Sequence, residues 1–159
     1  MLPELSATAN AYVTGLRFHD NLVRDFTAAD WAVRDACGHD PRWLVGHLAT
    51  YRQRLLAALG LPCAAAPWEA AFLKGSSPAD VPADLDMQVV LASFRAAHEL
   101  IMAHWDELTP EDLAEPIGRK LPNGGEDVGG LIRFLAWHEA YHLGQLALLR
   151  RLAGRPGLG

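Results

Sequence analysis

The feature that most constrains the fold of this chain is a pair of histidines inside a long apolar run. His138 and His142 lie four residues apart in the stretch WHEAYHLGQLALLRR, residues 137–151. The apolar residues around them keep helical spacing, namely Leu131, Phe134, Leu135, Leu146 and Leu149. Side chains four apart on a helix project from one face, so the two imidazoles can bind one divalent metal ion. The sequence therefore predicts a core-facing helix that carries part of a metal site.

The same stretch also spells H-E-x-x-H, because Glu139 follows His138. In zinc metalloproteases of this motif the Glu acts as general base, and a third ligand comes from downstream. Residues 143–159, however, contain no His, Asp, Glu or Cys. A third protein ligand must then come from an earlier helix. No stretch shows the alternation typical of the strands that a protease of this kind needs, so we favour a helical metal site.

Composition limits the class of protein. The chain has 159 residues, which suits a single domain over 1–159, and 50% of them are apolar. Its net charge of -5 argues against a nucleic-acid partner. No signal peptide or membrane-spanning run is predicted, and Cys37 and Cys63 form no paired motif, so we expect a cytoplasmic protein without a membrane partner.

Helical periodicity predicts an all-α protein, a four-helix bundle with a long crossover connection. The four long helices are expected over residues 3–26, 41–59, 84–108 and about 131–153. Capped turns are expected at Thr27–Asp30 and Thr109–Asp112. Residues 60–83 are rich in Pro, Gly, Ala and Ser, and predict the crossover with one short helix around Trp68 to Lys74. With a connection of this length, the third helix need not run antiparallel to the second.

Of the five remaining histidines, one is a candidate ligand and three others are interpreted as structural or surface residues. His47 flanks the apolar stripe of the second helix and is directed at or near the core. A lone histidine in such a place is more often structural, but the distant pair makes His47 the expected third ligand. His19 is interpreted as a hydrogen-bonded or partly exposed residue. His98 and His104 are interpreted as surface or boundary residues, and as the first substitutes should His47 fail.

If the second and fourth long helices face one another, three imidazoles supply three ligands and leave open positions, as in catalytic metal sites. Zinc, nickel, copper and iron all suit such ligands. Three nearby residues are candidates for the substrate pocket, namely Tyr51, Glu139 and Gln145. Glu139 would reach a metal-bound water. Each also has a structural interpretation, as a core tyrosine, a solvated glutamate and a packing hydrogen bond, respectively.

The motif W-L-V-G-H-L-A at Trp43–Ala49, together with H-E-A-Y-H-L-G-Q at His138–Gln145, resembles the DinB family, also described as DinB/YfiT-like. The resemblance covers nearly the whole chain. It implies a four-helix bundle of unusual connectivity, frequent homodimers, and a divalent metal ion, usually nickel or zinc, bound by His47, His138 and His142. The family name reflects DNA-damage-inducible expression and does not imply DNA binding.

Some members of that family look like metal-dependent transferases that join low-molecular-weight thiols, such as bacillithiol or mycothiol, to electrophiles, and others resemble hydrolases. Our leading hypothesis is therefore a metal-dependent thiol S-transferase whose partners are a small-molecule thiol and an electrophile. The alternatives are a metal-dependent hydrolase, a non-catalytic metal-binding or stress-response protein, and a helical dimer whose histidines bind no metal. Loss of turnover in an intact His47→Ala bundle would favour catalysis, whereas melting would favour a structural metal.

Overall fold

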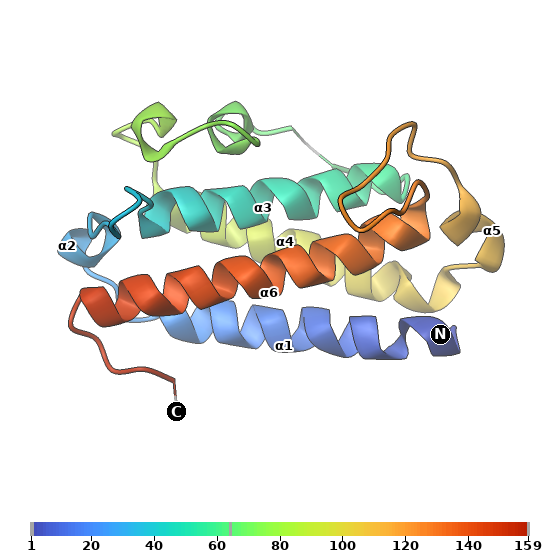
Figure 1. The fold of residues 1–159 in the computed structure, drawn as a ribbon, viewed down its shortest axis with the longest axis horizontal. Coiled ribbons are helices and arrows are strands. Elements are labelled where there is room, and N and C mark those ends of the chain that lie inside the picture. The colour runs from blue at the N-terminus through green and yellow to red at the C-terminus, as the bar shows by residue number, and fades with distance from the viewer. Residues whose placement is uncertain (1, 64, 159) are drawn as a thin grey trace.

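Four long helices build the protein, as expected. The computed structural model describes residues 2–63 and 65–158, and in these ranges it contains no β-strand. The long helices are α1 (Ser6–Val23), α3 (Pro41–Ala58), α4 (Met87–His104) and α6 (Val128–Leu152), and they pack into one bundle (Figure 1). A 3-10 turn, η1 (Pro3–Leu5), leads into α1. The predicted all-α four-helix fold is confirmed.

The helices form a closed ring in which α1 packs on α6, α6 on α3, α3 on α4, and α4 on α1. The colours of Figure 1 show that α1 and α6 run in one direction, whereas α3 and α4 run in the other. Neighbouring parallel helices require a long connection, and the segment between α3 and α4 provides it. This segment passes along the outside of α3 and holds two 3-10 turns, η2 (Glu69–Phe72) and η3 (Pro78–Asp80). Residue 64 of the predicted crossover lies outside the described residues.

Helix ends are fixed by side chains that the sequence makes recognisable. The carboxylate of Asp40 accepts a hydrogen bond from the Trp43 amide at 2.9 Å, with Pro41 in the first turn of α3. The predicted capping boxes of Thr27 and Thr109 are both formed, at the starts of the short helices α2 (Ala28–Trp31) and α5 (Pro110–Ala114).

A polar layer crosses the middle of the bundle between two apolar clusters. One cluster draws on Leu22, Leu44, Phe94 and Leu146, and the other on residues nearer the opposite end, such as Leu5, Leu55, Ile101 and Ile132. Between these positions each long helix contributes buried polar side chains, which are His19, His47, Thr50, Arg52, His98, Glu139 and His142. Buried polar groups require partners, so this layer is where chemistry is expected.

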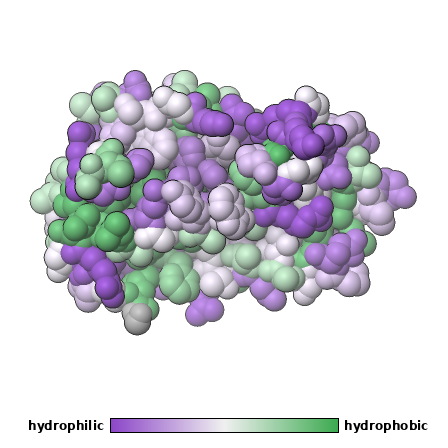
Figure 2. Space-filling model, viewed as in Figure 1, coloured by the Kyte–Doolittle hydropathy of each residue, from purple (hydrophilic) through white to green (hydrophobic). Residues whose placement is uncertain are grey.

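The surface in Figure 2 shows hydrophilic side chains gathered over the loop between α5 and α6, and a hydrophobic area over the C-terminal end of α6. Leu148 and Leu152 are about half exposed on that end of α6. None of the helices described here is both long enough and apolar enough to cross a membrane.

Candidate metal centre

Three histidines from two helices meet in the polar layer. The Nε2 atom of His138 lies 3.1 Å from Nε2 of His47 on α3 and 3.1 Å from Nε2 of His142, one turn further along α6. His47 and His142 are buried, whereas His138 is partly exposed. The three histidines selected from the sequence thus form one group that could bind a metal ion.

Hydrogen bonds on the far side of two imidazoles set their tautomers. His47 donates from Nδ1–H to the carbonyl oxygen of Phe72 at 2.6 Å. A carbonyl can only accept, so the proton is on Nδ1 and the lone pair of Nε2 points to the centre. His142 donates in the same way from Nδ1–H to Oε1 of Gln145 at 2.6 Å. Orienting partners of this kind are typical of metal-ligating histidines.

The spacing and protonation of the imidazoles fit a divalent ion. Metal–nitrogen bonds of about 2.0–2.1 Å place neighbouring ligand nitrogens roughly 2.9–3.4 Å apart in tetrahedral or octahedral geometry, which brackets the 3.1 Å seen here. Burial lowers the pKa of His47 to about 4 and that of His138 to about 3. Burial also lowers the pKa of His142. All three are therefore neutral near pH 7, as ligation requires.

A glycine explains how the crossover reaches His47. A Cβ atom on Gly46 would lie 2.3–2.5 Å from three ring atoms of Phe72, a contact that real side chains do not make. Only glycine therefore lets the fully buried Phe72 ring pack directly against α3. The same packing brings the Phe72 carbonyl to His47, so the glycine of the G-H-L motif supports the histidine that follows it.

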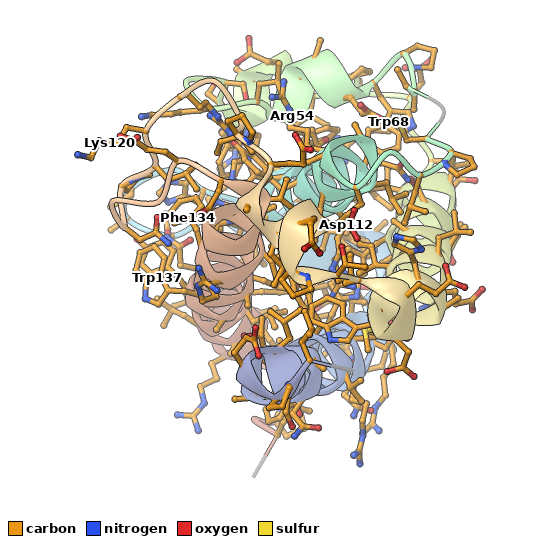
Figure 3. The ribbon with its side chains drawn as sticks, turned by 90° about the vertical axis from the view of Figure 1, so that its right-hand side faces the viewer. Arg54, Trp68, Asp112, Lys120, Phe134 and Trp137 are labelled. Atoms are coloured by element: carbon orange, nitrogen blue, oxygen red, sulfur yellow. The ribbon has the colours of Figure 1, made fainter. Side chains whose placement is uncertain are left out.

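The histidines lie at an open cleft of about 620 Å3, between the crossover and the loop that precedes α6. Aromatic rings form much of its wall. Trp43 stacks on His47 with ring centroids 4.6 Å apart, and Tyr51 lies 4.6 Å from His47 and 4.8 Å from His138. Phe134 lies 5.8 Å from His138 and is labelled on α6 in Figure 3. Of the predicted pocket residues, Tyr51 thus lines the cleft and Gln145 orients His142.

Glu139 lies elsewhere, because its carboxylate faces the core of the bundle. Both of its oxygens accept from the Arg52 guanidinium, at 2.7 and 2.8 Å. Glu139 is 5% exposed and is absent from the residues that line the cleft. The structure therefore does not bring it to the position of a protease-like general base. Gly15 makes room for it, since a Cβ there would lie 2.2 Å from Glu139 Oε1.

Arg52 is a buried residue of the polar layer that was not predicted from the sequence. Besides Glu139 it donates from Nη1 to Nδ1 of His98 at 2.6 Å, and its guanidinium lies over the rings of Tyr12 and Phe94 at 4.8 and 4.6 Å. The spacing Leu48, Arg52, Leu55 placed it on the core face and was the available signal.

His98 was predicted at the surface or boundary, and this was wrong. Arg52 gives its ring a partner inside the bundle, while burial and that cation lower its pKa to about 4. His19 is buried and hydrogen-bonded through Nδ1 to Asp20 at 3.1 Å, and His104 is partly exposed beside Glu107, both as expected.

Comparison with known proteins identifies one family. The model of the DinB superfamily matches residues 19–146, a range that contains all three clustered histidines. A search of curated proteins finds no match to this chain.

Proposed function

The chain belongs to the DinB superfamily, and from this premise we propose that it is a divalent-metal-dependent S-transferase, which joins a low-molecular-weight thiol to a small electrophile. The observation that carries the proposal is the convergence of three histidine Nε2 atoms on an open cleft. Three protein ligands beside space for a further molecule are typical of catalytic metal sites, whereas structural sites are closed by four.

Imidazole nitrogens suit nickel and zinc, the two ions that we propose for the site. Either ion would supply a positive charge that lowers the pKa of a thiol entering the cleft. Phe72 and Gln145 prepare the site by holding the His47 and His142 rings with their Nε2 lone pairs directed inward.

The cleft itself supports a reaction between two small molecules. Its volume of about 620 Å3 lies within the roughly 300–1,000 Å3 of small-molecule sites. Trp43, Tyr51 and Phe134 give it aromatic walls against which the apolar part of an electrophile can pack. In the proposed reaction the sulfur forms a bond to carbon of the electrophile. The thiol proton passes to solvent, and any leaving group departs with its electron pair.

A non-catalytic role, in which the metal serves to join α3 to α6, receives less support. The ion pair between Arg52 and Glu139 already links the same two helices through two hydrogen bonds in the core. The bundle therefore has a metal-independent connection at this level, and the three histidines remain available for chemistry at the cleft.

The test is a turnover assay with cysteine as thiol and chlorodinitrobenzene as electrophile, using protein loaded with zinc or nickel. We expect S-arylation and chloride release by the native protein, and loss of both in His47→Ala and after chelation. Circular dichroism of His47→Ala must show an intact bundle. Melting of this variant would favour the structural metal instead, and equal turnover by native and His47→Ala would reject the proposal. Release of acid from esters without S-arylation would point to a hydrolase.

A further inference from the structure

The lysines of this chain gather at one place. The sequence contains only two, Lys74 and Lys120, and both line the cleft above the histidines. Arg119 lines it as well. Lys74 comes from the crossover, whereas Arg119 and Lys120 come from the loop between α5 and α6, which Figure 3 shows with Lys120 at its outer edge. Two segments far apart in the sequence thus bring positive charge to the same rim.

The positive charge of this rim is not balanced by acidic side chains. Among the described residues that line the cleft there is no Asp or Glu. Within the described part of the chain, Lys74 and Arg119 take part in no ion pair, and Lys120 only approaches Glu126 at 3.9 Å, with both side chains well exposed. An ion pair between two exposed side chains contributes little free energy. In a protein of net charge -5, an unbalanced group of three cations is a local exception.

The backbone that carries these cations is held in place. On the crossover side, the Trp43 indole N–H donates to Ser76 Oγ at 3.0 Å, and Ser76 Oγ donates to the Leu73 carbonyl at 2.7 Å. On the loop side, the amide of Leu121 donates to the carbonyl of Gly125 at 2.8 Å, and the Leu121 side chain is buried. The cations are therefore presented by two ordered walls of one cleft.

We propose that the small molecule bound by this cleft carries an anionic oxygen group, a carboxylate or a phosphate, which Arg119 and Lys74 bind while the rest of the molecule extends to the histidines. The guanidinium fork of arginine matches both groups through paired charge-assisted hydrogen bonds. A cleft lined by one sign of charge also concentrates ligands of the opposite sign. This inference rests on the proposed function for the chemistry of the substrate, but the anion site itself is testable without turnover.

The test measures anion binding to metal-free protein by NMR, following the indole N–H of Trp43, which belongs to the cleft wall. The probes are succinate, its neutral dimethyl ester and inorganic phosphate. We expect at least one anion, and not the ester, to shift the Trp43 signal saturably. Arg119→Gln should weaken that binding at least about tenfold, and Lys74→Gln less, because charged hydrogen bonds are lost. The control Arg17→Gln, an exposed position on α1, should bind like the native protein.

Tighter binding of succinate than of phosphate would assign a carboxylate, and the reverse order a phosphate. Absence of binding by both anions, equal binding of the ester, or unchanged affinity in Arg119→Gln and Lys74→Gln would overturn the inference. These results are separable from the proposed function. Arg119-dependent anion binding in a protein without S-transfer would reject only the proposed reaction, and S-transfer without anion binding would reject only the anion site.

Discussion

Two polar clusters connect α3 to α6 at nearly the same level, yet they differ in how their polar atoms are satisfied. In the core cluster of Arg52, Glu139 and His98, both carboxylate oxygens accept hydrogen bonds from the guanidinium, which also donates to the imidazole. In the metal cluster, His47 and His138 direct Nε2 atoms at each other across 3.1 Å, with no proton on the His47 nitrogen. The first cluster is complete within the protein, whereas the second directs imidazole nitrogens at one point and could bind a metal ion.

The difference shows how neighbouring residues on one helix acquire unrelated roles. His138 and Glu139 are adjacent on α6, but about 100° of helical rotation directs one to the cleft and the other to the core. Each cluster also depends on a helical glycine, Gly46 for the metal cluster and Gly15 for the core cluster. We therefore expect damage to the core cluster to change stability, and damage to the metal cluster to change metal binding.

The largest expected effect comes from breaking the core cluster. Arg52→Met leaves the Glu139 carboxylate buried without its cation and should lower the free energy of unfolding by about 3–5 kcal/mol. Urea denaturation of the metal-free protein measures this. The double variant Arg52→Met, Glu139→Leu should recover most of the loss, because an apolar pair replaces the ionic one. If Arg52→Met alone were as stable as the native protein, the claim that the core cluster stabilises the fold would be contradicted.

Substitution of the two supporting glycines should show that both clusters affect stability, but that only one of them affects metal binding. Gly46→Ala and Gly15→Ala each force a tight contact and should each cost about 1–3 kcal/mol of unfolding free energy. Only Gly46→Ala should also weaken metal binding, by about 10–100-fold, because Phe72 no longer orients His47. Titration with zinc and urea denaturation measure the two effects.

The matched control for this pair is Gly144→Ala on α6, where an added Cβ meets nothing within 4 Å. It should gain about 0.5–1 kcal/mol from helix propensity and leave metal binding unchanged. Equal loss of zinc affinity in the Gly46 and Gly15 variants would show that the two clusters act as one unit.

The expected effect that is smallest at neutral pH is on acid sensitivity. Burial lowers the folded-state pKa of five histidines below the ordinary 6.5, with values of about 4 for His47 and His98 and about 3 for His138. The unfolded chain therefore binds more protons. Stability is complete above about pH 6.5 and falls as the pH decreases toward 4, by at most about 1.4 kcal/mol per pH unit for each histidine.

Removal of one titrating histidine should reduce this dependence. In metal-free protein, the unfolding free energy of His47→Ala should fall less steeply between about pH 6.5 and pH 4 than that of the native protein. Urea denaturation at several pH values measures the slope. Identical slopes would mean that His47 is protonated to the same extent in the folded and unfolded states.

The sequence predicted the helices and the pair of His138 and His142 because both depend on local spacing, whereas the full set with His47 was implied by the resemblance to the DinB family. Helical periodicity places His138 and His142 on one face, and an apolar stripe places His47 toward the core. The partner of His47 could not be predicted, since the Phe72 contribution is a backbone carbonyl from a crossover without periodicity. The motif H-E-x-x-H was misleading for Glu139, because the partner that fixes its direction, Arg52, is 87 residues away.

The meeting of cationic side chains at the rim of the cleft could not be predicted from the sequence either. Lys74 and Arg119 belong to irregular segments, where no repeat relates position in the sequence to position in space. Their meeting follows from the parallel course of α3 and α4, which carries the crossover along the outside of α3 (Figure 1).

The measurement that tests the central claim most directly is the metal content of the chain by elemental analysis. Protein purified without chelator or metal-affinity column should contain about one nickel or zinc ion per chain. His47→Ala and His138→Ala should lose it while keeping helical circular dichroism, and the control His104→Ala, a partly exposed position outside the histidine cluster, should retain it. A native protein that takes up no ion on dialysis, or a His47→Ala variant that keeps its ion, would contradict the account.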